Sequence, residues 1–380
     1  MLQIALTLAL LVGAGLLIHT MMKIARVTSG FETSHILTMS VTEVQSWSTW
    51  ASFHRQALER VAAIPGVQYA AFAWGVPLTG NNWPATLEIE GQPPVVKESD
   101  KAALPLRAVT PDYFKLIGMP LIQGREFRPS DNDKAQPVAI VNQAFADRFF
   151  PHGDGIGRKF WSNGRDKPAT QIVGEIANSR TDDLTQQAAP EIYLPLWQAI
   201  AFSKHLLVRT TANPRAAVVA VERALRSIDP TAAVENVKTL EQIRDESLAS
   251  RTFATNLLSG FSAVGSVLTL VGIYGLLSLS VASRRRELAI RSAVGAQQSD
   301  LRNLVFGEGF RLIGGGVLIG VALAIVLSQV LKSFLYEVQP GDPLTLTVVG
   351  GLFVGVGLLA CWVPVRRAAK VDPLEALRYE

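Results

Sequence analysis

Cysteine and charged residues are scarce in this sequence. Its 380 residues include one cysteine, Cys361, and charged side chains make up 18% of the chain. A single cysteine excludes an intrachain disulfide, so a domain outside the cytoplasm would have to be stabilised by its core alone. The low charged fraction and the positive mean hydropathy favour a membrane protein with a polar extramembrane part.

Motifs that carry catalysis or bind cofactors are also missing. No G-x-x-x-x-G-K-[ST] phosphate loop and no G-x-S-x-G elbow occur, and GDGIG at 153–157 is predicted to be a turn. Asp182 and Asp183 are interpreted as solvated surface. Metal-ligand spacing is absent among the histidines, which are His19, His35, His54, His152 and His205. The sequence therefore predicts no enzyme, no cofactor and no metal site in this chain.

Four uncharged apolar runs are present instead, at 1–22, 253–283, 312–331 and 343–365. Each reaches the roughly 20 residues that a helix needs to cross the hydrocarbon core. Four such runs argue against the alternative of buried helices in a soluble protein. The predicted fold class is a membrane protein, α-helical with four transmembrane helices, plus an α+β extracytoplasmic domain.

The first run, 1–22, has two interpretations. A cleaved signal peptide would need Lys or Arg ahead of the apolar part and a small-x-small site before Lys23, and neither is evident. A retained anchor helix is therefore favoured. The very short stretch ahead of it is consistent with the later part of a longer gene product or with a truncated one.

Positive charge sets the predicted orientation. The segment 284–311 and the tail 366–380 are rich in arginine, whereas the loop between the third and fourth runs carries only Lys332. Basic residues mark cytoplasmic loops. The segment 284–311 and the tail are thus predicted to be cytoplasmic, with 23–252 outside. Because the basic residues gather beside apolar runs, the net charge of +4 does not indicate a nucleic-acid partner.

The outer segment is predicted to be α+β. A strand–helix–strand pattern occurs near each of its ends, which suggests a split core assembled from both ends. An inserted β-rich subdomain is expected at about 107–196. The expected core elements are strands 37–44, 67–74, 205–211 and 232–237, with helices at 49–63 and from Pro214. The expected elements of the insertion are strands 137–142 and 170–176 and a helix at 143–150.

Two features flank the membrane on its inner side. Residues 284–294 are predicted to form a short helix that ends at Gly295, and a second helix from Ser299 runs into the third span. The first is interpreted either as a docking helix or as an ordinary interfacial helix. In the tail, Arg366 and Arg367 are expected to reach the inner headgroups, and Asp372 and Pro373 to begin a short helix.

The second run is longer than a membrane requires. Its 31 uncharged residues would form a helix of about 46 Å, against a hydrocarbon core of about 30 Å. Tilt absorbs part of the excess. The rest is predicted to project outward as a stalk.

These residues resemble a known family. RRRELAIRSAVGAQQSDL after a span and PVRRAAKVDPLEALRYE at the end are similar to the permeases of MacB/FtsX-type ABC transporters. The outer segment resembles the MacB-like periplasmic core domain at 109–127, 137–151, 156–160 and 190–196. The whole chain is similar to one half, the second, of the duplicated permeases of that family.

The resemblance implies a non-catalytic permease in the bacterial inner membrane, used in efflux or export of envelope substrates. A separate cytoplasmic ABC ATPase would bind ATP, and its motion would reach the outer domain through the second span (mechanotransmission). The expected partners are that ATPase, a second permease half (self or sister) and a periplasmic adaptor. The residues expected to couple to the ATPase are Arg284, Arg285, Arg286, Glu287, Arg291 and Gly295.

Two alternatives remain open at this point. One is an FtsX-like signalling scaffold whose outer domain regulates an envelope hydrolase. The other is an orphan or truncated permease half without a motor.

Overall fold

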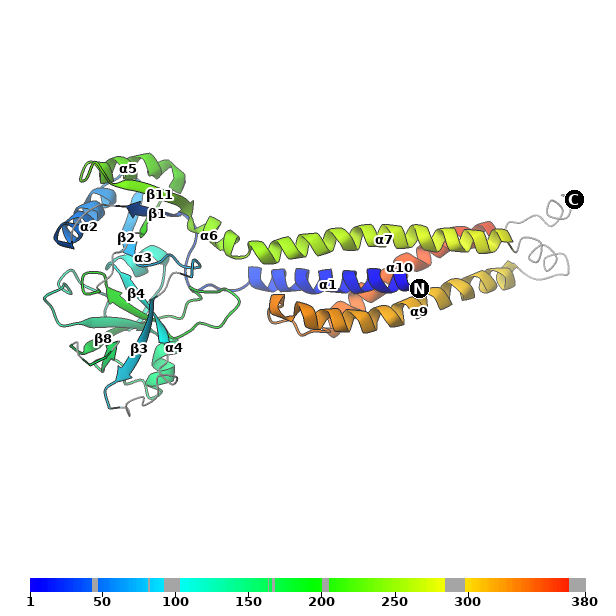
Figure 1. Ribbon diagram of the computed structural model, residues 1–380, viewed down its shortest axis with the longest axis horizontal. Helices are drawn as coiled ribbons and strands as arrows, with labels where there is room; N and C mark the ends of the chain where they lie inside the picture. Colours follow the sequence, from blue (N-terminus) through cyan, green and yellow to red (C-terminus); the bar gives the residue numbers. More distant parts are fainter. Residues whose placement is uncertain are drawn as a thin grey trace, which may run out of the picture. The chain divides into compact units, whose positions relative to one another are not determined.

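The structure is a computed structural model that describes residues 1–42, 47–80, 83–91, 103–162, 164–165, 168–199, 205–283 and 298–368. The chain divides into two compact units (Figure 1). Residues 1–26 and 249–380 form a helical unit, and residues 27–248 form an extramembrane unit. Each unit is described by itself.

The described residues of the helical unit form four long helices: α1 (Leu2–Ala25), α7 (Ala249–Ser283), α9 (Gln298–Val330) and α10 (Pro343–Ala368). Helix α1 packs against each of the other three (Figure 1), and its buried residues lie on most of its faces along its length. Its apolar side chains, among them Leu8, Val12 and Leu16, form the centre of the core of this unit.

Small residues allow this close packing. A Cβ atom at Gly316 of α9 would lie 2.5 Å from Ile4 Cγ2, and one at Gly320 would lie 3.0 Å from Leu8. Helices in a membrane gain no hydrophobic free energy by associating, so they depend on close van der Waals contact, which small residues permit. The glycines of α9 therefore set how near α1 can approach.

The polar residues that interrupt the first apolar run make contacts between elements of this unit. Thr7 Oγ1 lies 2.9 Å from Thr269 Oγ1 of α7 and 3.3 Å from the carbonyl oxygen of Gly265. Thr20 Oγ1 accepts from the backbone N–H of Tyr336 at 3.5 Å. These contacts satisfy groups that would be costly to expose to lipid.

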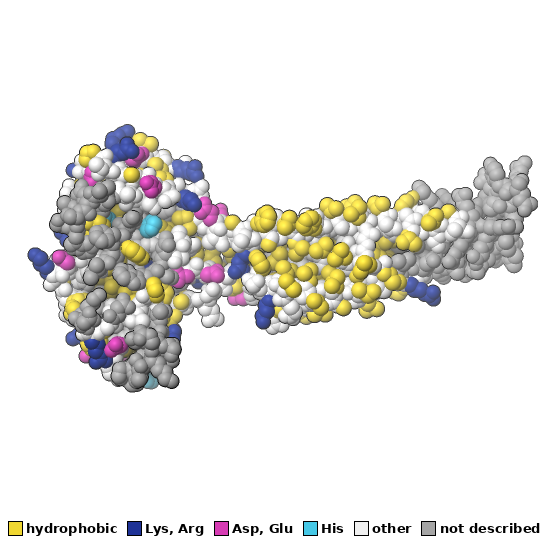
Figure 2. All heavy atoms as spheres, in the orientation of Figure 1, with side chains coloured by type: hydrophobic (Ala, Val, Ile, Leu, Met, Phe, Trp, Pro, Cys, Tyr) yellow, Lys and Arg dark blue, Asp and Glu magenta, His cyan; other side chains and the backbone are white. Residues whose placement is uncertain are grey.

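Three helical segments are long and apolar enough to span a membrane among the described residues: Leu2–Ala25, Ala249–Ser280 and Ile313–Phe334. The expected fourth span lies in α10, whose described apolar stretch, Pro343–Leu359, is shorter than that criterion requires. Figure 2 shows hydrophobic side chains over the visible face of these helices. Many of them are exposed, such as Phe261 and Val271 of α7, as expected of a lipid-facing surface.

The extramembrane unit is built on one sheet. Its eleven strands, counted over the described residues, run in the order β11-β1-β10-β2-β4-β3-β7-β8-β6-β9, with β5 paired to β8. The strands are β1 (Ile36–Thr42), β2 (Val67–Ala73), β3 (Trp83–Ile89), β4 (Ala103–Val109), β5 (Leu121–Gly124), β6 (Val138–Asn142), β7 (Lys159–Ser162), β8 (Thr170–Ile176), β9 (Ile192–Pro195), β10 (His205–Thr210) and β11 (Ala233–Thr239).

Residues alternate between two cores, which lie on opposite faces of the first four strands in the sheet order, β11, β1, β10 and β2. Leu37, Met39 and Leu206 pack with helices α2 (Trp47–Ala62) and α5 (Val218–Arg226). Ile36 and Leu207 belong to the core on the other face, where α3 (Tyr113–Ile117) and α6 (Leu240–Ser247) pack. This alternation follows from the two-residue period of a strand. Strands from both ends of the segment are neighbours, because β1 pairs with β10 and β11.

The central region, which lies between β2 and β10 in the chain, contributes β3 to β9 and α4 (Gln143–Phe149). A separate core, which includes Phe145, Phe160 and Ile172, lies here. Residue 107 is the expected start of the inserted subdomain. Strand β3 lies entirely before it, yet it pairs with β7. The strands thus extend the same sheet through β2 and β4, which pair at Ala73 and Val109.

We predict that Gly316→Val destabilises the helical unit by about 1–3 kcal/mol, because the added methyl groups collide with Ile4 in a packed interface. The measurement is the loss of helical ellipticity of the detergent-solubilised chain as sodium dodecyl sulfate is added. Gly314→Val in the same helix is the matched control, since nothing lies within 4 Å of a Cβ there. Equal shifts for the two variants would contradict the packing argument.

Candidate functional site

The predicted coupling residues lie outside the part of the chain that the structure describes. This applies to Arg284, Arg285, Arg286, Glu287, Arg291 and Gly295, and to Asp372 and Pro373 of the tail. Arg366 and Arg367 fall within α10, close to its end. The coupling role of the six residues between Arg284 and Gly295 and the cytoplasmic placement of the four tail residues remain predictions. The structure instead describes α7 and α9, the elements on either side of the expected docking segment.

Helix α7 is the longest of these elements. It runs without a break for 35 residues and ends at Ser283, directly before the arginine cluster. At 1.5 Å per residue it is about 52 Å long. On its other side, one residue, Leu248, separates it from α6 of the extramembrane unit. Two consecutive helices therefore lead from the outer domain toward the expected cytoplasmic loop.

Helix α6 was missed by the sequence analysis, although a signal for it exists. Thr239 Oγ1 accepts from the N–H of Gln242 at 3.2 Å, and Gln242 Oε1 accepts from the N–H of Thr239 at 3.0 Å. This is a capping box, and the T-x-x-Q spacing at 239–242 would have predicted a helix start. The cap and the burial of Leu240 and Ile243 hold α6 on the sheet.

The loop between α9 and α10 binds α1 and α7. Lys23 Nζ donates to the carbonyl oxygen of Glu337, and Arg251 Nη1 of α7 donates to that of Phe334 at 3.2 Å. Tyr336 and Val338 are buried in the loop. From the sequence, Lys332 of this loop indicates only the topology. In the structure the loop also holds the ends of α1 and α7 through these hydrogen bonds.

Asp342 anchors the same loop to two helices. Its Oδ2 accepts from the N–H and the hydroxyl of Thr345, at 3.1 and 2.6 Å, and so caps the start of α10. The hydrogen bonds from Thr345 are the main cause that lowers the pKa of Asp342. His19 Nδ1 of α1 lies 3.5 Å from the same oxygen.

A cluster of charged side chains is buried in the extramembrane unit. Arg107 of β4 is 1% exposed and contacts two carboxylates. Its Nη2 donates to Asp182 Oδ1 at 2.5 Å, and its Nε lies 3.6 Å from Glu191 Oε1. Asp182, which the sequence analysis interpreted as solvated surface, is therefore an ion-pair partner with a side chain only 34% exposed. The error has a physical cause: these residues are 75 positions apart in the chain.

Glu191 receives two further hydrogen bonds. Thr181 Oγ1 donates to its Oε1, and Tyr193 Oη donates to its Oε2 at 2.6 Å. Burial raises the pKa of Glu191, and the Arg107 guanidinium and the two hydroxyl donors oppose that rise. Burial also raises the pKa values of Tyr113 and Tyr193, so both phenols stay protonated.

Asn142 connects this cluster to the central strands. Its Oδ1 accepts from the N–H of Phe145, which caps α4, and from the N–H of Glu191 at 2.9 Å. Its Nδ2 donates to the carbonyl oxygen of Ala189 at 2.7 Å. The buried network thus joins β4, β6, β9 and α4. No group of three or more His, Cys, Asp or Glu side chains that could hold a metal ion occurs in the described ranges.

The chain has helices that are long and apolar enough to span a membrane, and an α+β domain is inserted after the first of them. This architecture is that of a membrane protein with a large extramembrane domain. Residues 1–228 match the MacB-like periplasmic core domain, and residues 259–373 match the FtsX-like permease C-terminal family. The chain therefore belongs to the MacB/FtsX-type ABC transporter permease family. It is a membrane protein with a periplasmic-type domain, and the family implies an ATPase partner.

Relatives support this assignment. The chain is 26% identical over 290 residues to the uncharacterized ABC transporter permease YvrN of Bacillus subtilis, covering 72% of this chain and 69% of that protein. It is 24% identical to the macrolide export ATP-binding/permease protein MacB of Neisseria meningitidis and 25% identical to the pyoverdine export protein PvdT of Pseudomonas aeruginosa. These matches cover 72% and 70% of this chain, but it spans only 43% and 41% of those two proteins.

Solved structures resemble parts of the chain. The periplasmic region of MacB from Actinobacillus actinomycetemcomitans aligns with a TM-score of 0.40 at 14% identity, over 59% of this chain and 97% of that one. The extracellular domain of the transporter YknZ from Gram-positive bacteria aligns with a TM-score of 0.35 at 14% identity, over 52% of this chain and 100% of that one.

We predict that Arg107→Met destabilises the extramembrane unit by about 3–5 kcal/mol, because it leaves Glu191 buried without its cation. The double variant Arg107→Met/Glu191→Gln should lose less stability than the single variant Arg107→Met. Urea unfolding of the full chain in lipid nanodiscs, followed by tryptophan fluorescence, measures both.

Arg158→Met is the matched control for this cycle, since Arg158 pairs with Asp154 on the surface. It should leave the unfolding midpoint close to that of the wild type. A double variant less stable than Arg107→Met would show that the charge of Glu191 is not what Arg107 compensates.

Proposed function

We propose that this chain is a non-catalytic permease subunit that couples ATP hydrolysis by a separate cytoplasmic ATPase to movement of its periplasmic domain. The observation that carries the proposal is the 35-residue helix α7, which follows α6 of the extramembrane unit after a single residue. A continuous helix of about 52 Å exceeds the roughly 30 Å hydrocarbon core. Such a helix transmits displacement along its axis without needing a channel.

The motor is proposed to engage the arginine-rich segment that follows α7. Arg284, Arg285 and Arg286 would meet the ATPase, Glu287 and Arg291 would hold the docking helix as an i,i+4 pair, and Gly295 would end it. The end of α10, with Arg366 and Arg367, and the tail after it, with Asp372 and Pro373, would lie on the same cytoplasmic side. ATP would be bound by the partner, so this chain itself carries no cofactor.

The proposed setting is the bacterial inner membrane, crossed four times, with the fourth crossing made by α10. A second permease half, self or sister, would complete the transporter, and a periplasmic adaptor would contact the outer domain. Relatives named for macrolide and pyoverdine export support efflux or export of envelope substrates as the class of activity.

The second candidate is an FtsX-like scaffold that regulates an envelope hydrolase. The match of 259–373 to the FtsX-like family is common to both candidates. ATP-driven accumulation of a substrate inside inside-out vesicles that contain the chain and its ATPase would favour the transporter. ATP-dependent activation of a hydrolase without export would favour the scaffold.

We predict that Arg285→Glu/Arg286→Glu reduces co-purification of the cognate ATPase at least about tenfold, since reversal of two charges at an interface costs more than 1.4 kcal/mol. Quantitative mass spectrometry of the tagged chain, isolated from membranes, measures the ratio of ATPase to permease. The matched control is Arg223→Glu/Arg226→Glu on α5 of the outer domain, which should leave the ratio unchanged. Undiminished ATPase recovery with the Arg285/Arg286 variant would disprove docking at this segment.

We predict that Gly260→Pro in α7 uncouples the outer domain from the motor. Proline removes a helix hydrogen bond and kinks the helix, at a cost of about 3 kcal/mol. Nothing lies within 4 Å of a Cβ at Gly260, so Gly260→Ala is a control that leaves helix α7 intact. The measurement is ATP-dependent change in fluorescence energy transfer between two copies labelled in the outer domain, alongside ATPase activity. Domain movement that persists in the proline variant would refute transmission through α7.

A further inference from the structure

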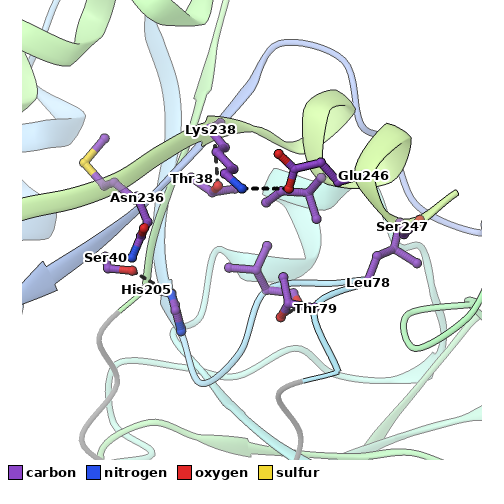
Figure 3. Close-up of a pocket in the computed structure, with 12 residues that line it drawn as sticks. Thr38, Ser40, Leu78, Thr79, His205, Asn236, Lys238, Glu246 and Ser247 are labelled. Atoms are coloured by element: carbon purple, nitrogen blue, oxygen red, sulfur yellow. Dashed lines mark hydrogen bonds and ion pairs between the residues drawn. The ribbon is translucent and has the colours of Figure 1, made fainter. Parts of the chain in front are cut away.

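A cavity lies on one face of the sheet in the extramembrane unit (Figure 3). Its volume is about 380 Å³. Residues of β1, β10, β11 and α6 line it, together with the segment 76–79 after β2. A water molecule occupies about 30 Å³ of liquid, so the space equals about a dozen waters. That size lies in the range of small-molecule sites.

Strand irregularity shapes one wall of the cavity. Thr38 pairs with Lys238 and Ser40 pairs with Glu235, so Met39 of β1 faces two residues of β11. This is a β-bulge, and bulges re-aim side chains beside functional sites. Asn236, within the bulge, has a left-handed backbone with φ +52°. Asn236 and Lys238 both line the cavity.

A second left-handed residue lies on the opposite wall. Leu78 has φ +67°, which is unfavourable for a bulky side chain. Its N–H donates to the carbonyl oxygen of Thr181 at 2.6 Å, which holds the segment in this conformation. Strained backbone persists where the surrounding structure enforces it, and it is concentrated at binding sites. Two such residues thus face one cavity.

The lining divides into polar and apolar sides. Ser40, His205 and Asn236 gather on one side of the cavity, where Ser40 Oγ lies 3.5 Å from His205 Nδ1 (Figure 3). Val76 and Ile243 supply apolar surface and belong to the adjoining core. A molecule that fits both sides needs hydroxyl or amide groups at one end and an apolar body.

The charges of the lining compensate each other. Lys238 Nζ donates to Glu246 Oε2 at 2.7 Å across the cavity rim (Figure 3). With this pair closed, the described lining has no net charge to offset the desolvation of a charged ligand. A ligand with a single net charge would leave one member of this pair or its own charge uncompensated, so it is disfavoured. A neutral ligand leaves the pair closed, and a zwitterion can open it and pair its two charges with Lys238 and Glu246.

We propose that this cavity is a binding site for a small neutral or zwitterionic molecule that carries hydroxyl or amide groups on an apolar body. Ile243, Glu246 and Ser247 place α6 in the wall. A bound molecule therefore contacts the helix that leads into α7 after one residue. The proposal concerns binding alone and does not depend on the proposed transport function.

The test uses the full chain in lipid nanodiscs and four probes that share a phenyl ring. Phenyl β-D-glucoside is neutral, L-phenylalanine is zwitterionic, phenyl phosphate is anionic and phenyltrimethylammonium is cationic. Saturation-transfer NMR measures binding of each, with empty nanodiscs subtracted. The expected result is binding of the glucoside and phenylalanine, and at least about fivefold weaker binding of the two charged probes.

Two variants locate the binding. Asn236→Gly removes the amide while glycine keeps the left-handed backbone, so the fold is retained. It should weaken binding of the glucoside about two- to tenfold, the usual effect of one lost hydrogen bond. Ser40→Phe fills the polar side and should abolish binding. His35→Gly is the matched control, because His35 has φ +59° but lies outside the cavity lining.

Each contrary outcome overturns the proposal. Absence of transfer to the neutral and zwitterionic probes would show that the cavity is only a gap filled by solvent. Equal or stronger binding of the charged probes would refute the assigned ligand class. Binding that Asn236→Gly and Ser40→Phe leave as unchanged as His35→Gly does would place the probes elsewhere.

Discussion

Close packing around α1 is the constraint on which the helical unit depends. Lipid gives helices no hydrophobic reason to associate, so contact must come from shape and from polar groups that find partners. Gly316 and Gly320 admit Ile4 and Leu8, and Thr7 meets Thr269. The polar interruptions of the first apolar run are thus the points at which α1 is held by its neighbours.

The ends of the helices are fixed by a different kind of contact. Lys23, Arg251 and His19 reach the loop between α9 and α10, where Asp342 also caps α10. Through this loop, these contacts hold the ends of α1, α7 and α10 together, as the proposed transmission along α7 would require.

Different interactions hold the extramembrane unit together, namely those of a sheet and a buried ion cluster. Apolar residues alternate across the first four strands and serve two cores. Arg107, Glu191 and Asp182 meet between the strands that connect those cores to the central region. Breaking such a pair is costly, although the pair itself is weak evidence of net stabilisation. Arg107 lies on β4 and Glu191 lies directly before β9, so their contact fixes the position of β4 relative to β9.

Periodicity and composition determined much of this protein from the sequence alone. Apolar runs of span length predicted the long helices, and the strand and helix patterns at 67–74, 137–142 and 143–150 coincide closely with β2, β6 and α4, because these signals are local. Tertiary structure alone decided the pairing of Arg107 with Asp182, the clamp on α1 and the bulge at Asn236. These depend on residues far apart in the chain, which only the folded backbone brings within contact distance.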